Sequence, residues 1–391
     1  RPSLTAGELT MLLTDEQQLI RDTMRAFAQE RLAPHAARWD RESHFPREEL
    51  RALGELGALG MVVPDEWGGA GMDYVSLAVA LEEIAAGDGA TSTIVSVQNS
   101  VVCGPLAAFG TDAQKQRYLL PLARGEQLGC FCLTEPHVGS EAGGLRTTAR
   151  REGDEYVLDG VKQFITSGKN GDVAIVMAVT DKAAGKRGIS AFIVDASAAG
   201  LDDSRHIPVM APHPLATVML RDCVVPDTAL LGPLNGGFKL AMQTLDIFRA
   251  SVAGAALGFA RRALVEATQH AQQRRMFGHT LADFQLTQAK LGQMAADVDA
   301  GALLTYRAAW LRDDAVRRGS NARVTAEPAM AKMTATENAQ RVIDAALQMH
   351  GGLGVMVGSK VESLYRDIRS LRIYEGATEV QQLIIGKHVL S

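Results

Sequence analysis

The sequence lacks the residue patterns of several protein classes. Its four cysteines form no Cys-x-x-Cys pair and no Cys/His cluster at metal-ligand spacing, so no metal centre is indicated. We expect these thiols to be reduced and packed, as in a cytoplasmic protein. The net charge is -5, and no run of Lys or Arg is long enough to indicate binding to nucleic acid or an anionic membrane. No apolar run approaches the ~18 uncharged residues of a membrane-spanning helix.

The rest of the composition is that of a globular protein with a large core. The chain has 391 residues, of which 47% are apolar and 22% charged, and this suggests two or three domains. Residues 1–10 carry no signal-peptide pattern, and we expect them to be an extension that precedes the first domain at Met11. The lack of a targeting pattern favours a bacterial-type cytoplasmic protein.

The first of three regions, residues 11–127, has helical periodicity. Thr14 and Gln17 form a capping box at the start of the first helix. We expect this helix to end at Pro34, because proline disfavours the helical conformation of the residue before it.

The other two regions differ from each other in period. Residues 128–234 consist of short β-branched and apolar runs separated by glycine-containing turns, which predicts a compact antiparallel β domain. Residues 235–391 are helical again. The proline-free runs 238–270 and 283–318 exceed the average helix of ~11–12 residues, and helices of this length usually pack in a bundle. The sequence therefore predicts an α+β protein of three domains, in the order helical, antiparallel β and helical.

Two segments of the predicted β domain have side chains that suit a flat polar ring. In residues 131–140, a strand leads into a loop with hydroxyls, glycines and free backbone N–H groups, which can hold a ring edge or a phosphate. Phe164 and Thr166 lie two apart in a strand and therefore point to the same face. Taken alone, each pattern is more typical of an ordinary turn or a core aromatic residue than of a binding site.

Three further segments lie in the helical C-terminal region. Arg274 and Arg275 follow a long helix and can pair with a pyrophosphate, although a solvated helix end has the same pattern. The paired glycines of 348–352 allow a ligand to come close, or they form a helix C-cap. Glu375 lies between apolar residues, where a carboxyl group has a raised pKa and can act as a general base; an ordinary loop glutamate is the alternative. Thr378 is expected to cap the last helix.

Together and in this order, the five segments resemble the acyl-CoA dehydrogenase family, from about Leu13 to Leu390. The resemblance implies a helical domain, a middle β domain, a C-terminal four-helix bundle and one FAD per subunit. The residues it assigns to the flavin end are Phe131, Leu133, Thr134, Gly139, Ser140, Phe164, Ile165 and Thr166. Those it assigns to the FAD of a neighbouring subunit are Arg274, Phe277, Phe284, Gln285, Gln348, Met349, Gly351 and Gly352, and it also places Ala377, Thr378 and Glu379 at the cofactor.

The same resemblance makes Glu375 the catalytic base. Phe248 occupies the position at which other branches of the family carry the base, which leaves Glu375 in a Tyr-Glu-Gly setting typical of short- and medium-chain members. Four residues depart from the family pattern: His137 replaces a glycine, Phe164 a tryptophan, Met276 a threonine and Ala377 a hydroxyl residue. The residues assigned to the acyl-CoA substrate are Ser140, Asp246, Phe248, Arg249, Tyr374 and Gly376.

The implied activity is α,β-dehydrogenation of a saturated acyl-CoA, with electrons passed to an electron-transfer flavoprotein, in a homotetramer. The acyl group is expected to be short, branched, cyclic or medium in length, and neither nucleic acid nor a membrane is an expected partner. The alternatives are a flavin-dependent acyl-CoA oxidase or monooxygenase relative and a non-catalytic acyl-CoA-binding scaffold. The presence of Glu375, Thr134, Thr166 and Arg274 together counts against the scaffold.

Overall fold

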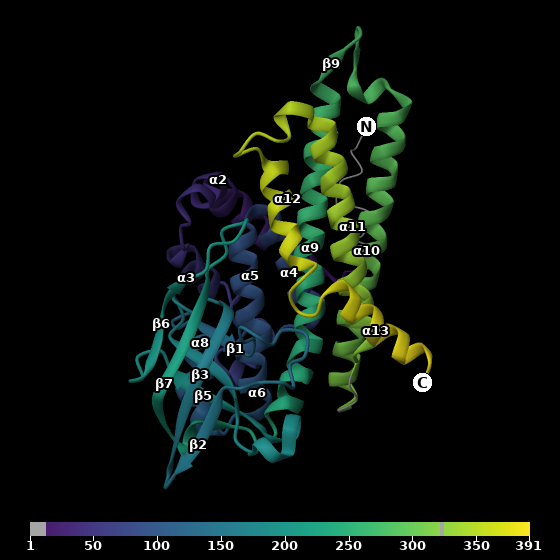
Figure 1. The fold of residues 1–391 in the computed structure, drawn as a ribbon. Coiled ribbons are helices and arrows are strands. Elements are labelled where there is room, and N and C mark those ends of the chain that lie inside the picture. Colours follow the sequence, from purple (N-terminus) through teal and green to yellow (C-terminus); the bar gives the residue numbers. More distant parts are fainter. Residues whose placement is uncertain (1–12, 321–323) are drawn as a thin grey trace.

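The computed structural model describes residues 13–320 and 324–391 (Figure 1). The expected extension before Met11 lies outside the described residues. Helices of the N-terminal region stand beside a sheet, and long C-terminal helices run side by side next to them. The order helical, β and helical is the one predicted from the sequence.

The N-terminal region begins with the expected capping box. In α1 (Asp15–Phe27), the Gln17 N–H donates to Thr14 Oγ1 at 3.2 Å, and the Thr14 N–H donates to Gln17 Oε1 at 3.0 Å. The prediction that Pro34 ends this helix is wrong. A π-helical turn (Ala28–Leu32) leads into α2 (Ala33–Glu42), and Pro34 lies in the first turn of α2, where no intrahelical N–H is required.

The rest of this region contains an uncharged helical stretch. From Gly89 to Phe109 the path is 21 residues long and apolar enough, by composition, to cross a membrane, so the expectation that no such run exists is wrong. In the structure, 78% of its most apolar window is buried inside the protein. Its apolar side chains therefore belong to the core. The helices after α2 are α3 (Arg47–Glu55), α4 (Tyr74–Gly87), α5 (Gly89–Val97), α6 (Gly104–Phe109), α7 (Asp112–Gln114) and α8 (Leu120–Ala123), with π-helical turns at Gln98–Cys103 and Lys115–Leu119.

The middle region forms a sheet with the strand order β6-β7-β3-β2-β4-β5-β8, and β1 pairs with β4. Its strands are β1 (Gly129–Cys132), β2 (Thr148–Glu152), β3 (Glu155–Thr166), β4 (Val173–Val179), β5 (Ile189–Asp195), β6 (Leu201–His206), β7 (Leu215–Pro226) and β8 (Leu230–Leu231). Most neighbours are antiparallel, but β1 runs parallel to β4, and β2 meets β4 in one parallel pair. The sheet is therefore mixed, which corrects the prediction of an antiparallel domain. The chain between β1 and β4 contains β2 and β3, a connection long enough for parallel pairing.

A β-bulge shapes the end of β3. Lys162 pairs with Val218 and Ile165 pairs with Ala216, so β3 has one residue more than its partner over this interval. Phe164 lies in the bulge with a φ of +58°. Ile165 is buried, whereas Phe164 is 53% exposed and Thr166 is partly exposed. This burial pattern agrees with the prediction that Phe164 and Thr166 share a face.

The C-terminal region is the predicted bundle of long helices. Its members are α9 (Gly237–Gln273), α10 (Gln285–Arg317), α11 (Ala326–His350) and α12 (Lys360–Leu371), and α13 (Thr378–Val389) packs against α11. With 37 residues, α9 spans about 55 Å. It contacts β5 near its start, and its other end leads into a hairpin of β9 (Arg275–Met276) and β10 (His279–Thr280). The hairpin and the sheet therefore lie at opposite ends of the molecule (Figure 1).

Candidate functional site

Glu375 lies in the short connection between α12 and α13. Its φ is +56° and that of Gly376 is +84°, so two successive residues are in the left-handed region. For a residue other than glycine, this conformation costs about 1–3 kcal/mol and persists only where the surrounding structure holds it.

Two side chains hold the middle of this connection. Gln381 of α13 donates to the carbonyl oxygens of Glu375 and Gly376 at 2.9 and 2.8 Å. The Lys332 ammonium group of α11 donates to the same Gly376 oxygen at 2.9 Å. A Cβ at position 376 would lie 2.4 Å from the Gln381 amide nitrogen, so this packing requires glycine. Sequence reasoning missed both Lys332 and Gln381.

The Glu337 carboxylate of α11 joins the two ends of the connection. It accepts hydrogen bonds from Arg372 at 2.9 Å and from Thr378 Oγ1 at 2.6 Å. The prediction that Thr378 caps α13 is therefore wrong. Thr378 is the first residue of α13, and Ala377 occupies the N-cap position without a side-chain cap. The Thr378 hydroxyl is engaged by a carboxylate on another helix, which local sequence spacing does not reveal.

The Glu375 carboxyl group has the surroundings predicted for a general base. Its Oε2 is buried and has no hydrogen-bond partner among the described residues. Burial raises its pKa to about 7, although the positive charges of Arg249 and Lys332 act in the opposite direction. A carboxyl group with a pKa near neutrality is suited to accept a proton at physiological pH.

Helix α9 brings the predicted substrate residues toward this loop. Asp246 and Arg249 form a buried ion pair, with 2.6 Å between Oδ1 and Nη1. Thr325 donates to the other oxygen of Asp246 at 3.0 Å. Tyr374, the residue before the candidate base, packs against the main hydrophobic core. The Asp246 and Arg249 positions are thus fixed by charge, while Tyr374 is fixed by packing.

Phe248 and a group of buried serines connect α9 to the N-terminal helices. Phe248 is only 5% exposed and belongs to the main core. Its carbonyl oxygen accepts from Ser251 Oγ at 2.8 Å. Ser251 Oγ is in turn bonded to Ser96 at 2.7 Å and to Ser100 at 3.1 Å. A large ring and three hydroxyls, two of which are bonded to that of Ser251, therefore fill this part of the interior.

A buried ion pair joins the two β segments predicted to bind a ring. Lys162 Nζ lies 2.9 Å from Glu135 Oε1 and donates to the Leu133 carbonyl at 3.2 Å, and both charged side chains are at most 2% exposed. The Gln163 N–H donates to the Thr134 carbonyl at 2.9 Å. Burial alone would raise the pKa of Glu135, but Lys162 and nearby N–H groups outweigh it and lower that pKa. The segments 131–140 and 164–166 therefore lie side by side.

The open side of these two segments leaves space for a ligand. A Cβ added at Gly139 would meet nothing within 4 Å, and Ser140 is exposed. Phe131 and Leu133 are partly buried against the main core. His137, which departs from the family pattern, places its Nε2 3.5 Å from Glu135 Oε2.

A cavity of about 670 Å³ at the far end of the bundle is lined by five of the other predicted cofactor residues, namely Arg274, Gln348, Met349, Gly351 and Gly352. Arg274 is the C-cap of α9 and Gly351, with φ +59°, is the C-cap of α11, so two helix ends meet here. The ligand-binding and capping interpretations of 348–352 are thus compatible. Phe277 is 84% exposed on the hairpin, and Phe284 and Gln285 begin α10; these three do not line the cavity. The lining comprises His270, Arg274, Met276, Leu281, Leu286, Thr287, Lys290, Gln348, Met349, His350, Gly351, Gly352 and Leu353.

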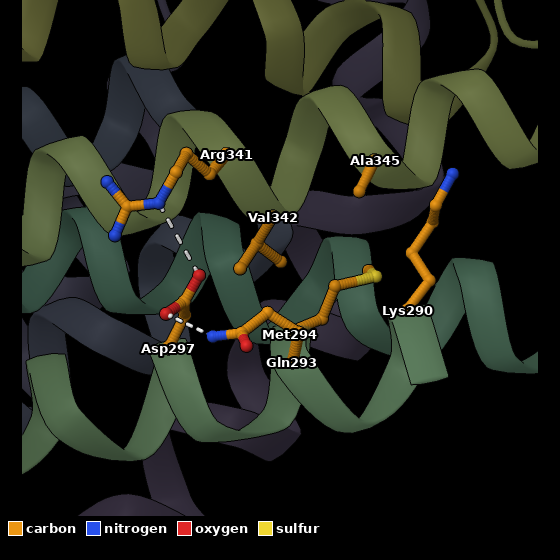
Figure 2. Close-up of a pocket in the computed structure, with 7 residues that line it drawn as sticks. All are labelled: Lys290, Gln293, Met294, Asp297, Arg341, Val342 and Ala345. Atoms are coloured by element: carbon orange, nitrogen blue, oxygen red, sulfur yellow. Dashed lines mark hydrogen bonds and ion pairs between the residues drawn. The ribbon is translucent and has the colours of Figure 1, made fainter. Parts of the chain in front are cut away.

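A smaller cavity of about 360 Å³ lies between α10 and α11 (Figure 2). Figure 2 shows Asp297 in contact with Gln293 at 3.1 Å and with Arg341 at 3.5 Å. This cavity shares Lys290 with the larger one and contains none of the sequence-predicted residues. Its lining comprises Lys290, Gln293, Met294, Asp297, Arg341, Val342 and Ala345.

Most of the predicted cofactor residues therefore form two separate groups in one chain, whereas Ala377, Thr378 and Glu379 lie at the start of α13 and do not line the cavity. The loop that follows Ser140 reaches the start of α9, where a Cβ on Gly143 would lie 3.8 Å from Phe238. Arg274 lies at the other end of the same helix, about 55 Å away along its axis. One chain does not bring both groups to one small molecule (Figure 1).

Sequence models of three domains match the chain in the observed order. The acyl-CoA dehydrogenase N-terminal domain matches residues 14–126, the middle domain 130–223 and the C-terminal domain 235–390. The chain belongs to the acyl-CoA dehydrogenase family. It is 42% identical over 380 residues to the short-chain specific acyl-CoA dehydrogenase, mitochondrial, of Rattus norvegicus, across 97% of this chain and 91% of the relative. It is 39% identical over 383 residues to the caffeyl-CoA reductase-Etf complex subunit CarC of Acetobacterium woodii, across 97% of this chain and the full length of the relative.

Solved structures of acyl-CoA dehydrogenases share the fold. A glutaryl-CoA dehydrogenase from Mycobacterium smegmatis in complex with FADH2 matches with a TM-score of 0.91 at 31% identity, covering 98% of this chain and 96% of that chain. The predicted three-domain fold, the oxidoreductase class and the dependence on FAD are thereby confirmed. A non-catalytic scaffold is not supported, because the relatives are enzymes.

The residues of this chain fit FAD as a cofactor. Phe164 offers a half-exposed ring, which suits a flat isoalloxazine, and the backbone at Gly139 is open to an approaching ligand. Arg274 offers a guanidinium group, which pairs with a pyrophosphate, in a cavity with two glycines whose Cβ positions are empty. Met276 lines this cavity but provides no hydrogen bond to a phosphate, so the departure from the family pattern removes one donor.

Proposed function

We propose that the chain oxidises a short acyl-CoA thioester to its α,β-unsaturated product, with Glu375 as the base that removes the α-proton. The observation that supports this most directly is the state of the Glu375 carboxyl group. One of its oxygens is buried without a hydrogen-bond partner among the described residues, and burial raises its pKa to about 7. A buried, unpaired acceptor costs stability, which is expected of a group kept available for substrate.

The thioester must also be made more acidic, because a carboxylate is too weak a base for an unassisted α-proton. The Glu375 N–H takes part in no hydrogen bond among the described residues and can donate to the thioester carbonyl. One donor of this kind typically contributes ~2.7–4 kcal/mol to transition-state stabilisation. FAD, when bound, supplies the acceptor for the hydride that leaves the β-carbon. Glu375 holds the α-proton on its carboxyl group until it exchanges with solvent.

The proposed preference for a small acyl group rests on Phe248. This ring and the bonded hydroxyls of Ser96, Ser100 and Ser251 occupy space that a long chain would need. The similarity to a short-chain specific enzyme supports the same conclusion. Electrons are proposed to leave to an electron-transfer flavoprotein, because a similar chain is a subunit of a reductase-Etf complex.

We further propose a homotetramer in which two chains complete each FAD site. The support is the separation of the two groups of cofactor residues along α9, which a second chain would resolve. A monomer in light scattering that still reduces its flavin with substrate would contradict this assembly.

A screen of acyl-CoA thioesters tests the function. The purified protein, with one non-covalent FAD per subunit, is mixed anaerobically with saturated thioesters of varied length and branching, and loss of flavin absorbance is recorded. Short and short branched acyl groups should reduce the flavin fastest, and an electron-transfer flavoprotein should accept the electrons. Failure of every thioester to reduce the flavin would contradict the proposed reaction, and rapid reduction by long chains would contradict the role of Phe248.

A further inference from the structure

Lys332 is a fully buried lysine on the apolar face of α11. Its exposed fraction is 0%, and its neighbours on this helix include the buried Ala329, Ala335 and Ala339. Burying an ammonium group is costly unless its charge and its hydrogen bonds are compensated. A methionine would fill a similar volume without this cost, so the charge calls for an explanation other than packing.

The Lys332 side chain is hydrogen-bonded to the connection that carries Glu375. Its Nζ donates to the Gly376 carbonyl at 2.9 Å. That oxygen already accepts from Gln381 at 2.8 Å, so Lys332 is not needed merely to satisfy it. Burial lowers the pKa of Lys332 to about 8, and the charge of Glu375 acts against this shift. The other charges that act on Lys332 are those of Glu337 on α11, Glu379 on α13 and Arg249 on α9.

We propose that Lys332 is a positioning residue, whose buried ammonium group holds the Gly376 peptide and keeps the Glu375 carboxylate ionised. The inference rests on the proposed function of Glu375 as the base. The hydrogen bond to Gly376 supports the left-handed backbone that carries Glu375. The positive charge offsets the burial that drives the carboxyl group toward its neutral form, and Arg249 acts from the opposite helix in the same direction. Lys332 thus acts on the reaction through Glu375 and not by contact with the substrate.

The test measures the ionisation of Glu375 without turnover. The infrared band of the protonated carboxyl group is assigned by its loss in Glu375→Gln and is then titrated with pH in the FAD-loaded protein. In Lys332→Met the titration midpoint should rise by roughly one pH unit, as expected for loss of a neighbouring opposite charge. Lys332→Gln keeps an N–H donor without the charge. The titration midpoint of Glu375 should rise by the same amount in this variant. If Lys332→Met does not fold, Lys332→Gln alone tests the proposal.

Lys360 provides a matched control. It is a partly buried lysine whose pKa is also lowered by desolvation, and it donates to a backbone carbonyl, that of Gly87, at 3.1 Å. Lys360→Met should leave the Glu375 titration unchanged. The proposal is overturned when both Lys332 variants titrate at the parent pH, or when Lys360→Met shifts the midpoint equally.

The kinetic readout separates this inference from the proposed function. At pH 6, flavin reduction by a good thioester should be about tenfold slower in Lys332→Met than in the parent, and the difference should shrink above pH 9, where Glu375 is ionised in both. If the titration midpoint of Glu375 rises in Lys332→Met but no thioester reduces the flavin of the parent, the proposed reaction is refuted. The effect of Lys332 on the ionisation of Glu375 is then still supported. An unchanged midpoint in a fully active parent would refute the role of Lys332 alone.

Discussion

Replacing Glu375 with glutamine tests the identity of the base. Glutamine keeps the size of the side chain and the backbone N–H, but it cannot accept the α-proton. Loss of a general base slows a reaction by ~10²–10⁴-fold, or about 2.7–5.4 kcal/mol of activation free energy. The parent should also show a rate that rises with pH through about 7, because burial raises the pKa of Glu375 and only the ionised carboxylate accepts a proton. Glu375→Gln should lose both the rate and this pH dependence.

The assay is anaerobic stopped-flow reduction of the flavin by a saturating short acyl-CoA, from pH 6 to 9. Glu55, an exposed glutamate at the end of α3, provides the control, because Glu55→Gln makes the same chemical change at a distant surface position. Unchanged FAD content and thermal stability exclude a folding defect in Glu375→Gln. A reduction rate near that of the parent, with the pH dependence retained, would refute Glu375 as the base and with it the proposed mechanism.

Changes elsewhere test other parts of the site. Glu375→Gly combined with Phe248→Glu should recover a minor part of the flavin reduction rate lost in Glu375→Gly alone. No recovery in the same assay would show that a carboxylate at position 248 does not reach the α-carbon of the substrate. Lys162→Met leaves the buried Glu135 without its cation and should lower the free energy of unfolding in urea by about 3–5 kcal/mol; an unchanged urea midpoint would show that the pair is not structural. Arg274→Ala should weaken FAD binding by roughly 10–100-fold, measured by flavin release on dilution, because hydrogen bonds to charged groups contribute ~1.5–3 kcal/mol.

Hydrophobic period was enough to predict the order of the regions and the long helices. The runs 238–270 and 283–318 correspond to α9 and α10 within a few residues at most ends. Features that depend on contact with a distant segment of the same chain were not predictable. The direction of β1 depends on β4, which lies some forty residues later, and the uncharged run at Gly89–Phe109 is explained only by the protein that surrounds it. Pro34 was misjudged because a π-helical turn precedes it and lets the helical path continue.

The candidate base could be found from the sequence, but the side chains that hold its backbone in place could not. Glu375 has apolar neighbours along the chain, and these are visible in the printed sequence. Glu337 and Gln381 look like ordinary polar residues of surface helices, and nothing in their spacing shows that they face the connection that carries Glu375. Lys332 did leave a signal, since it is a charged residue on an alanine-rich helix face. A lysine at such a position indicates a specific buried partner.

The length of α9 has a consequence for inheritance. In the proposed assembly Arg274 serves a neighbour's FAD, so a defect at position 274 weakens FAD binding at the partner's site and spares the chain's own site. When a chain with Arg274→Ala pairs with a chain with Glu375→Gln, the first keeps its own Glu375 and receives an intact Arg274. With random pairing, about a quarter of all sites are complete. Two alleles that are each impaired alone would therefore complement each other in one cell.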